Sequence, residues 1–466
     1  MTTPFSALAL DARFLANLDT LGYKSMTPVQ AASLPPALEG RDLIVQAHTG
    51  SGKTAAFGIG MLNRLNPTLF AVQGLVLCPT RELADQVAQE LRRLARGVGN
   101  IKILTLTGGV ALRPQAASLE HGAHIVVGTP GRVRDHLARR TLDLKRVQVL
   151  VLDEADRMTD MGFYDDIAAV ARDCPQWRQT LLFSATYPDD IRAATSELLR
   201  DPVEIVVDAA PTRPRIEQRF HEVPFESRDD AVATLLGNQP PGSAIVFCNT
   251  RVHCQELADL LHERGFAVRA LYGELEQRER DEILLLFSNR TVSVLVATDV
   301  AARGLDIADL DVVINAGMTP DPEVYVHRIG RTGRAGATGL ALTLCTSRDK
   351  KWVAQLENAS GETADWQPLP PPVDTPPAPA PMLTLCIAGG KKDKLRPADL
   401  LGALTGDAGL TREQVGKINI TQFTSYVAVA REVAGQALER LSKNAPLGGE
   451  FGAIKGRHFR MRLLAA

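Results

Sequence analysis

The sequence predicts an α/β protein with two tandem lobes, each built on a doubly wound parallel sheet, followed by a small α+β domain. Three features of the 466 residues lead to this prediction. Short, continuous runs of Val, Ile and Leu alternate with helical stretches, which is typical of parallel strands covered by helices on both faces. A polar, proline-containing stretch at 208–215 divides these runs into two sets. A proline-rich segment at 367–381 separates both sets from a tail with a different pattern.

The strands of the two lobes are predicted from the apolar runs in chain order. The first lobe, predicted over 1–208, has six candidates, at 43–46, 75–78, 103–106, 125–127, 149–152 and 180–183. The second lobe, predicted over 213–365, has five, at 244–247, 268–271, 292–296, 312–314 and 340–344. No residue-level repeat relates the lobes, so any duplication between them is architectural.

The segment predicted as a linker, 366–381, is rich in proline. Eight of the fifteen residues from Gln367 to Pro381 are proline, a composition that forms neither a helix nor a strand ladder. We therefore expect a semi-extended spacer. The tail, predicted as a domain over 382–466, has the order β-α-β-β-α-β, with strand candidates at 384–387, 416–420, 425–430 and 457–464. That order suits a small sheet of the split βαβ or RRM type.

The charge of the chain is unevenly distributed. The net charge of the whole chain is −2. From Met382 to the end, 13 Lys or Arg stand against 7 Asp or Glu, which gives +6 and leaves −8 on the preceding residues. A basic unit attached to an acidic body indicates a tail that is attracted to nucleic acid. A basic surface that serves only solubility is the alternative.

Composition excludes several classes of protein. With 45% hydrophobic and 23% charged residues, the chain is neither collagen-like nor wholly disordered. The cysteines show no Cys-x-x-Cys pair, which argues against a zinc knuckle, a redox motif or a disulfide framework; they are Cys78, Cys174, Cys248, Cys254, Cys345 and Cys386. No apolar run approaches ~18 residues. We expect a protein of the reducing cytoplasm that is neither exported nor membrane-spanning.

A phosphate-binding loop is predicted at 47–54, where AHTGSGKT follows the first strand and precedes a helical stretch. Glycines let backbone N–H groups approach phosphate, and the start of a helix adds partial positive charge. Lys53 would reach the β- and γ-phosphates, and the Thr54 hydroxyl would hold Mg²⁺. The rest of the loop consists of Thr49, Gly50, Ser51 and Gly52, and Ala47 stands where the generic pattern has its first glycine. A chance Gly-Lys-Thr is the alternative.

Adjacent carboxylates follow the strand candidate 149–152, in the sequence Asp153-Glu154-Ala155-Asp156. The carboxyl edge of an open parallel sheet is where ligands bind. Asp153 would anchor Mg²⁺, and Glu154 would orient and deprotonate the attacking water. Acidic residues that merely cap the next helix are the alternative. Both motifs in one lobe, in this order, predict nucleotide hydrolysis.

DEAD at 153–156, together with AHTGSGKT, resembles the DEAD-box RNA helicases, and this resemblance implies RecA-like lobes. GYKSMTPVQ at 22–30 resembles the adenine-reading motif of that family, with Phe5 as the upstream aromatic residue. The amide of Gln30 offers one donor and one acceptor, which suits adenine and opposes guanine O6. ATP is the nucleotide that this motif indicates.

The same resemblance assigns contacts with the RNA backbone. Hydroxyls, glycine N–H groups and guanidinium groups address phosphate without reading bases. The implied residues are Pro79, Thr80, Arg81, Gly109, Thr129, Gly131 and Arg132 in the first lobe, and Thr250, Gln277, Arg280, Thr298 and Gly304 in the second. Asp299 would lie against RNA or the lobe interface. For each motif taken singly, a helix cap or a turn is the alternative.

Coupling between hydrolysis and strand separation is also implied by the family's motifs. The SAT motif, with Ser184 and Thr186, is expected to form hydrogen bonds with Asp156. A further motif of the family, HRIGRTGR, begins at His327. Arg331 and Arg334 would reach the γ-phosphate from the second lobe, and Asp306 would lie near the ribose. An arginine supplied by a separate lobe makes hydrolysis depend on lobe closure. The chain departs from the family at Thr159 and at Ala316-Gly317, which removes no catalytic group.

The tail resembles the carboxyl-terminal, RRM-like RNA-binding domain of the DEAD-box protein A (DbpA) subfamily, through TLCI-GGKK and RP-DLLGALTG. The resemblance implies a 23S rRNA target, hairpin 92 near the peptidyl-transferase centre, and a role in assembling the 50S subunit. Two basic clusters could neutralise phosphate: Lys391, Lys392, Lys394 and Arg396, and then Lys455, Arg457, Arg460 and Arg462. Aromatic residues are sparse, namely Phe423, Tyr426, Phe451 and Phe459, so we expect recognition mainly by loops. The segment 444–453 is longer and richer in glycine than the subfamily's turn, so target preference can differ.

The sequence therefore predicts a cytoplasmic, ATP- and Mg²⁺-dependent RNA helicase that acts on structured RNA, with no membrane partner, no DNA and no required oligomer. A DNA-directed motor is one alternative, since phosphate contacts do not distinguish sugars. An ATP-gated RNA clamp or assembly scaffold that rarely separates strands is another.

Overall fold

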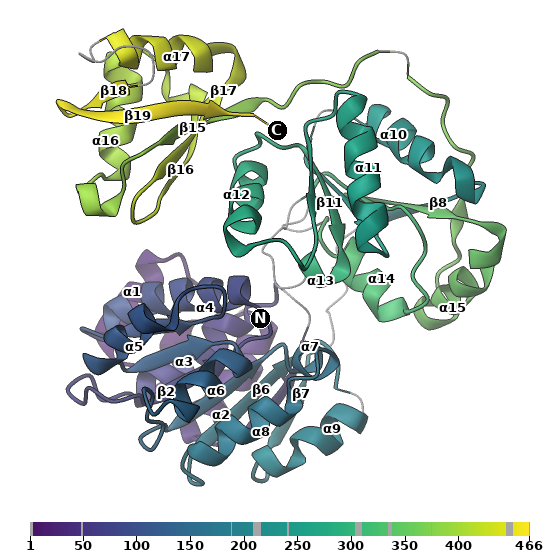
Figure 1. The fold of residues 1–466 in the computed structure, drawn as a ribbon. Helices are drawn as coiled ribbons and strands as arrows, with labels where there is room; N and C mark the ends of the chain where they lie inside the picture. Colours follow the sequence, from purple (N-terminus) through teal and green to yellow (C-terminus); the bar gives the residue numbers. More distant parts are fainter. Residues whose placement is uncertain are drawn as a thin grey trace. The chain divides into compact units, whose positions relative to one another are not determined.

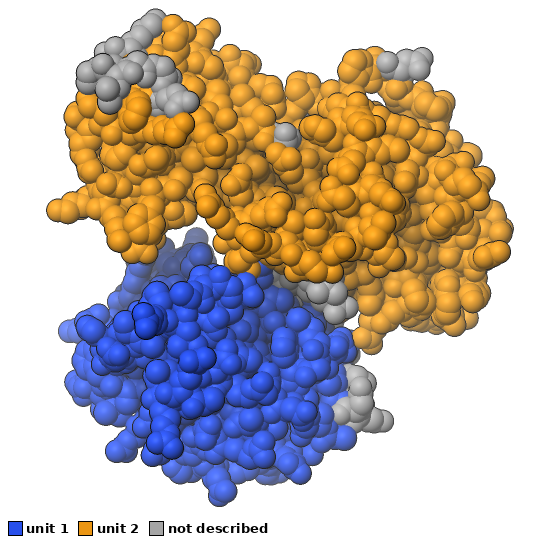
Figure 2. Space-filling model, in the orientation of Figure 1, with its two compact units in different colours: residues 1–213, 304–306 blue, residues 214–303, 307–466 orange. Residues whose placement is uncertain are grey.

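The computed structural model describes residues 3–47, 50–187, 189–207, 216–239, 242–302, 310–333, 338–373, 375–443 and 451–465. The chain divides into two compact units, one of residues 1–213 with 304–306 and one of residues 214–303 with 307–466 (Figure 2). Within the described ranges, no helix is both long and apolar enough to cross a membrane.

The first unit, purple to blue in Figure 1, is built on a parallel sheet. The sheet has seven strands in the order β3-β4-β2-β5-β6-β1-β7. The strands are β1 (Leu43–Gln46), β2 (Gly74–Leu77), β3 (Ile103–Leu106), β4 (Ile125–Gly128), β5 (Val149–Asp153), β6 (Gln179–Ser184) and β7 (Val203–Val206). Six of them coincide with the predicted runs to within a residue or so. The edge strand β7, which pairs with β1, was not predicted because its residues are partly or fully exposed and its pattern is not continuously apolar.

Helices cover both faces of this sheet, as the apolar runs predict. Successive residues of a strand point to opposite faces, so Leu43 and Val45 enter one core while Ile44 enters the other. β5 is divided between the same two cores. The helices are α1 (Ala12–Thr20), α2 (Pro28–Glu39), α3 (Lys53–Arg64), α4 (Arg81–Leu94), α5 (Leu112–Glu120), α6 (Pro130–Ala138), α7 (Ala155–Asp160), α8 (Tyr164–Asp173) and α9 (Asp189–Thr195).

The second unit begins with a lobe on another seven-stranded parallel sheet, in the order β10-β11-β9-β12-β13-β8-β14. The strands are β8 (Ile216–Glu222), β9 (Ala244–Cys248), β10 (Val268–Leu271), β11 (Val294–Thr298), β12 (Val312–Asn315), β13 (Gly339–Cys345) and β14 (Asp365–Trp366). Its helices are α10 (Arg228–Gly237), α11 (Arg251–Glu263), α12 (Gln277–Ser288), α13 (Asp299–Ala302), α14 (Pro322–Ile329) and α15 (Lys350–Ser360).

One predicted strand of this lobe is displaced. The run 292–296 was expected to be the strand, whereas β11 begins at Val294. The amides of Thr291 and Val292 donate to the carbonyl of Leu286, 2.9 and 3.3 Å away, so these residues close the turn after α12. The dividing stretch 208–215 lies outside the described residues, and β8 and β14 were not predicted.

The tail forms an antiparallel sheet in the order β16-β17-β15-β19-β18. Its elements are β15 (Met382–Ile387), α16 (Pro397–Gly402), β16 (Val415–Ile420), β17 (Ser425–Ala430), α17 (Arg431–Lys443), β18 (Phe451–Ile454) and β19 (Arg457–Leu464). The predicted β-α-β-β-α-β order is present, with β18 as an extra edge strand. Lys455 and Gly456, at φ of 51° and 70°, form the two-residue turn that a tight hairpin between β18 and β19 requires.

The proline-rich segment is extended, and it lies along the second lobe. Trp366, the first residue of the predicted linker, belongs to β14, whereas no helix or strand occurs in the described residues 367–373 and 375–381. The carbonyl of Pro371 accepts a hydrogen bond from Asn238 Nδ2 at 3.0 Å. Leu369 packs against the core of the lobe, and the carbonyl of Gln367 lies 3.0 Å from His221 Nδ1. The first part of the expected spacer is therefore held by the lobe.

Polar side chains join the second lobe to the tail. Thr384 Oγ1 lies 2.7 Å from Thr291 Oγ1 and accepts a hydrogen bond from Asn289 Nδ2 at 3.1 Å, and all three residues are buried. Lys417 Nζ donates to Ser288 Oγ at 3.0 Å. Hydroxyls, an amide and an ammonium group make these contacts.

Candidate functional site

The strand order sorts the predicted motifs into two groups at the carboxyl edge of the first sheet. The phosphate loop, the DEAD residues and SAT follow β1, β5 and β6, which are adjacent in the sheet. The motifs at 79–83, 108–109 and 129–132 follow β2, β3 and β4, which are adjacent on the other side of β5. Neighbouring strands lie about 4.8 Å apart, so each group forms one continuous surface.

The phosphate loop leads directly into α3. Gly50 and Gly52 have φ of +83° and +94°, a conformation that glycine adopts without steric cost. Lys53, the first residue of α3, is buried, and its Nζ donates to the carbonyl of Ala47 at 2.9 Å. Ser51 Oγ is buried and has no hydrogen-bond partner among the described residues. Thr49 lies outside the described residues.

Gln30 ties the predicted adenine-reading motif to this loop. Thr27 and Gln30 form a capping box at the start of α2, in which Gln30 Oε1 accepts from the amide of Thr27 at 2.9 Å. Gln30 Nε2 donates to the carbonyl of Gly52 at 3.1 Å. A Cβ at Gly52 would lie 2.5 Å from Gln30 Nε2, so the approach requires glycine. Phe5 is buried with its ring edge-on to Tyr23, the ring centroids being 6.0 Å apart.

The carboxylates after β5 differ in their surroundings. Burial raises the pKa of Asp153 to about 7, and the nearby charge of Lys53 opposes that rise. Glu154 has φ of 55°, which is uncommon for a residue with a side chain, and its Oε2 lies 3.5 Å from Arg157 Nε. This Glu154 oxygen accepts no hydrogen bond from the described residues. Backbone strain at such a position is typical of a functional site.

The residues around Asp153 suit Mg²⁺. A buried carboxyl with a raised pKa gains from a bound cation, and the unpartnered Ser51 hydroxyl lies in the loop beside Lys53 and Thr54. The carboxylate of Asp153 and the hydroxyls of Ser51 and Thr54 offer oxygen ligands, the type that Mg²⁺ prefers. The described residues contain no group of three or more His, Cys, Asp and Glu side chains fit to hold a metal. A Mg²⁺ ion here would therefore depend on phosphate and water for its other ligands, which is its usual mode of binding.

The expected hydrogen bonds between SAT and Asp156 are present. Asp156 Oδ2 accepts from the amides of Ala185 and Thr186, each at 3.1 Å, and from Thr186 Oγ1 at 3.3 Å. The amide of Asp156 donates to Ser184 Oγ at 3.2 Å. Because Asp156 is buried, these bonds fix the loop after β6 to the start of α7.

The other motifs of the first lobe meet around the loop after β3. A Cβ at Gly108 would lie 3.0 Å from Arg81 Nη2, so the guanidinium group lies against this glycine. Arg132 Nη1 donates to the carbonyl of Val110 at 3.0 Å and to Gln115 Oε1 at 2.8 Å. Arg81 and Arg132 are therefore brought together by one loop.

The remaining predicted residues of this surface have local structural roles as well. Thr80 caps α4 by accepting from the amide of Leu83 at 3.3 Å. Gly109 has φ of +74°. Pro79 precedes the cap, and Thr129 and Gly131 lie at the start of α6. The cap and turn alternatives thus apply to these positions, and they do not conflict with phosphate contacts.

The motifs of the second lobe also follow neighbouring strands, β9, β10 and β11. Thr250 caps α11 by accepting from the amide of His253 at 3.3 Å. Gln277 begins α12 and donates to Asp281 Oδ1 at 2.7 Å, and buried Arg280 donates to the carbonyl of Ala301. Thr298 ends β11.

The last motif is described only in part. His327 lies on α14, and Arg331 follows that helix and is buried. The carbonyl of Arg331 accepts from the amide of Leu310 at 3.2 Å. Gly304, Asp306 and Arg334 lie outside the described residues.

Arg328 is a central residue that the sequence interpretation missed. It is 2% exposed, and its Nε and Nη2 donate to the two oxygens of Asp299, each at 2.7 Å. Nη2 also donates to Asn249 Oδ1 at 2.7 Å, and Nη1 to Asn315 Oδ1 at 3.3 Å. The guanidinium group therefore joins the ends of β9, β11 and β12. Three polar residues at buried strand ends are the signal that could have predicted an internal cation.

The departure from the family at Ala316-Gly317 lies beside this network. The carbonyl of Gly317 accepts from Arg328 Nη1 at 3.4 Å. A Cβ at Gly317 would lie 3.1 Å from Arg228 Nη1. Small residues here leave room for two guanidinium groups.

In the tail, ion pairs link the two predicted basic clusters. Arg457 Nη2 lies 3.1 Å from Asp393 Oδ1, and Lys455 Nζ lies 2.5 Å from Asp399 Oδ1. Arg396 starts α16, where its amide donates to Asp399 Oδ2 at 3.0 Å. Lys391, Lys392, Lys394, Arg460 and Arg462 are exposed. The part of 444–453 before Phe451 lies outside the described residues.

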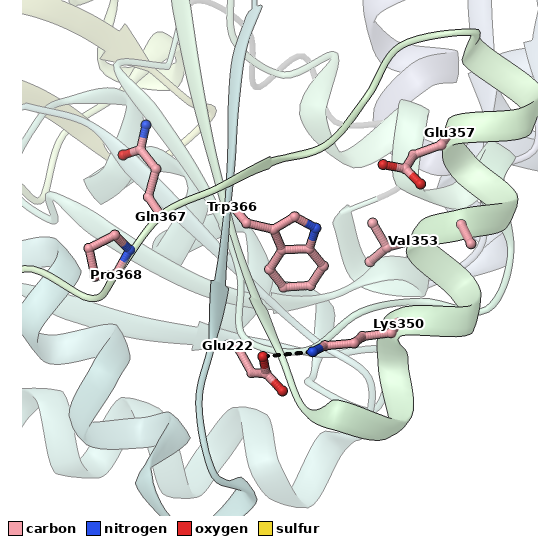
Figure 3. A pocket seen from close by; sticks show the side chains of 8 residues that line it. Glu222, Lys350, Val353, Glu357, Trp366, Gln367 and Pro368 are labelled. Carbon is pink, nitrogen blue, oxygen red and sulfur yellow. Dashed lines mark ion pairs between the residues drawn. The ribbon is translucent and has the colours of Figure 1, made fainter.

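A cavity of about 590 Å³ in the second unit contains none of the predicted site residues (Figure 3). Trp366 points into it, and an ion pair between Lys350 and Glu222 lies at its side, with 2.9 Å between Nζ and Oε2. Since this cavity lies beside α15 and β14, it is separate from the motif-bearing strand ends.

Three family profiles match the chain. The one described as DEAD/DEAH box helicase matches residues 27–194, and the one described as helicase conserved C-terminal domain matches 227–336. The one described as DbpA RNA binding domain matches 384–462.

Individual proteins are similar over most of the chain. ATP-dependent RNA helicase DbpA of Escherichia coli (strain K12) is 50% identical over 463 residues, covering 99% of this chain and 100% of that protein. DEAD-box ATP-dependent RNA helicase CshA of Geobacillus kaustophilus is 44% identical over 362 residues, covering 78% and 77%. The structure of S. cerevisiae Dbp5 bound to RNA and ADP BeF3 has a TM-score of 0.72 at 29% identity and covers 79% of this chain and 96% of that one.

Proposed function

The chain belongs to the DEAD-box family of ATP-dependent RNA helicases and is of the DbpA type, and from this premise we propose that it remodels ribosomal RNA during assembly of the large subunit. The observation that carries the proposal is the attachment of a basic domain of the DbpA RNA-binding family to the two helicase lobes. We propose that this domain selects a 23S rRNA stem-loop, hairpin 92 near the peptidyl-transferase centre, within 50S assembly intermediates.

In the proposed ATPase mechanism, the strand ends at β1 and β5 act together. The amides of the phosphate loop and the Lys53 ammonium group hold the β- and γ-phosphates of ATP. Asp153 and Thr54 would hold Mg²⁺, which neutralises charge that develops on the phosphates. Glu154 orients the attacking water and takes its proton. Its strained backbone and its Oε2, which accepts no hydrogen bond from the described residues, support this role.

Arginines of the second lobe complete the site in this proposal. Arg331 and Arg334 stabilise charge on the γ-phosphate when the lobes close, so hydrolysis occurs only in the closed state. Gln30 and Phe5 select adenine, and Asp306 contacts the ribose. Closure therefore requires a ligand that binds both lobes, and RNA is that ligand.

The proposed RNA surface follows the ends of β2, β3 and β4 in the first lobe and the ends of β9, β10 and β11 in the second. Arg81, Gly109 and Arg132 bind the backbone in the first lobe, and the residues after β9, β10 and β11 bind it in the second. Asp156, Ser184, Thr186 and His327 couple the two ligands. The hydrogen bonds between Asp156 and the loop after β6 support this role, because they join a nucleotide motif to the next strand.

We place the protein in the cytoplasm and propose that it acts without an obligatory oligomer. Six unpaired cysteines, five of them buried, support a reducing compartment.

A variant that lacks residues 382–466 tests the proposed target. The intact chain should unwind a duplex beside the hairpin 92 stem-loop faster than the same duplex beside an unrelated stem-loop, and the deletion should remove this preference while RNA-independent ATPase activity persists. Lys53→Ala is the control without ATPase activity. Equal rates on both substrates with the intact chain would refute the target. ATP-dependent tight binding without strand release would identify an RNA clamp instead.

A further inference from the structure

In the tail, two loops lie against each other at one end of the sheet. The lysine loop, residues 389–394, follows β15, and the hairpin loop, residues 421–424, joins β16 to β17. The amide of Lys391 donates to the carbonyl of Thr421 at 2.9 Å, and the amide of Lys392 donates to the carbonyl of Gln422 at 3.1 Å. Ser425 Oγ donates to the carbonyl of Gly389 at 2.6 Å. The backbones of the two loops are therefore held together by direct hydrogen bonds.

Gly390 makes this close approach possible. A Cβ on Gly390 would lie 2.6 Å from backbone atoms of Thr421, Gln422 and Phe423. The hairpin loop is also closed within itself, because Thr421 Oγ1 donates to the carbonyl of Thr424 at 2.8 Å. The position of residue 423 relative to the lysines is thus fixed by the backbone.

Phe423 is displayed at the tip of the hairpin loop. Its side chain is 60% exposed, whereas Tyr426 and Phe451 are partly buried and Phe459 is buried. Phe423 is the only exposed Phe, Tyr or Trp among the described residues of the tail. The Lys392 ammonium group lies 4.3 Å from the centroid of its ring, within the range of a cation–π contact. Exposing an apolar ring beside charged lysines contributes nothing to the core of the tail, which lies elsewhere.

We propose that Phe423 and the lysine loop form a binding site for an unpaired nucleotide of RNA, in which a base stacks on the Phe423 ring and Lys391, Lys392 and Lys394 bind the adjoining phosphates. An aromatic face accepts any base, and lysines around it bind the backbone. This inference deepens the RNA binding of the tail and rests on the proposed function only for the identity of the RNA. The aromatic contact with RNA is thereby assigned to a loop, because the sheet itself has few exposed aromatic residues.

Binding of the full-length chain to two RNA probes tests the site. One probe is a hairpin with an unpaired loop, and the other is the same stem closed into a continuous duplex. Phe423→Ala should weaken binding to the looped hairpin by about five-fold or more, and it should leave binding to the duplex unchanged. Phe423→Trp should retain the affinity, and its added indole fluorescence should be quenched by the looped hairpin.

The salt dependence separates stacking from charge. Phe423→Ala should leave the slope of log affinity against log salt unchanged, whereas Lys391→Gln should reduce its magnitude by about one unit or less. Phe225→Ala is the matched control, since Phe225 is 70% exposed with Arg228 over its ring at 5.1 Å but belongs to the second lobe. It should bind both probes as the unchanged chain does.

The outcomes distinguish the inference from the proposed target. Equal affinity of Phe423→Ala and the unchanged chain for the looped hairpin overturns the stacking site. Equal weakening on both probes also overturns it, because the ring would then not read unpaired bases. If the loss appears on any looped hairpin, but hairpin 92 is not preferred, the site stands and the ribosomal target falls.

Discussion

At the scale of single residues, buried charge decides how the second lobe is organised. Arg328 satisfies one carboxylate and two amide oxygens that end three different strands. The sequence could not show that Arg328 is the arginine of HRIGRTGR that joins these strand ends, since the arginines of the motif are chemically identical. What the sequence did show was the order of the motifs, and the structure places them after strands that are adjacent in the sheets.

Arg328→Ala should destabilise the second lobe by about 3–5 kcal/mol, because it leaves the Asp299 carboxylate without its bidentate partner. Chemical denaturation of the full-length chain measures this loss. Arg264→Ala is the control, since Arg264 pairs with Asp230 on the surface and its removal should cost about 0–1 kcal/mol. Equal effects of the two substitutions would contradict the buried network.

The contribution of Asp153 to the free energy of unfolding should fall as pH rises. Its pKa in the folded protein is raised to about 7, above the usual value for aspartate, because burial disfavours the charge. The folded state therefore holds a proton that the unfolded state has lost, so the contribution of Asp153 declines between its unfolded and folded pKa values and is lost above about pH 7. The nucleotide-free wild type should lose about 2 kcal/mol relative to Asp153→Asn between about pH 5.5 and pH 8. A pH-independent difference between the two proteins would refute the raised pKa.

At the scale of elements, the sequence predicted every strand of the two lobes whose residues are all buried, and the strands that it missed there carry exposed residues. β1, β5 and β9 match their predicted ranges to within a residue because a continuous apolar run has one simple interpretation. β7 and β8 mix polar and apolar residues, and β14 has two residues, so no run marks them. β7 and β14 lie at sheet edges and β8 lies between β13 and β14, so these strands are defined by partner strands that are distant in the sequence.

Two glycines of the tail should respond in opposite directions to alanine. Gly435 lies on the exposed face of α17 with nothing within 4 Å of an added Cβ, so Gly435→Ala should stabilise the tail by about 0.5–1 kcal/mol. Gly390→Ala should destabilise it by about 1–3 kcal/mol, because the new Cβ meets the hairpin-loop backbone. Thermal unfolding measures both. A stabilising Gly390→Ala would mean that the two loops are not in contact.

At the scale of the whole molecule, buried polar groups lie at the contact between the second lobe and the tail. Thr291, Thr384 and Asn289 satisfy one another, and each can be satisfied by water when the two parts separate. An interface of this kind differs from the apolar cores on either side of it. The tail is therefore suited to act as a separate folding unit.

A chain ending at residue 381 should remain soluble and monomeric, because the hydroxyls and amides that lose their partners when the tail is removed can form hydrogen bonds with water. Size-exclusion chromatography and the RNA-independent ATPase rate check this expectation, and the rate should stay within about three-fold of the intact chain. Aggregation of the shortened chain would show that the tail covers an apolar surface of the lobe.

The proline-rich segment sets how far the tail can travel. Leu369 and Pro371 contact the second lobe, and a Cβ at Gly265 of the same lobe would lie 3.8 Å from Pro377, so contacts with the lobe extend along most of the segment. In a polyproline-like conformation the fifteen residues of the segment span about 47 Å, and the contacts with the lobe keep the tail closer to it than this limit. The tail binds one segment of the RNA. The RNA duplex that the lobes open must therefore lie close to that segment in the folded RNA. The length of the proline-rich segment thereby limits the distance between the RNA bound by the tail and the duplex opened by the lobes.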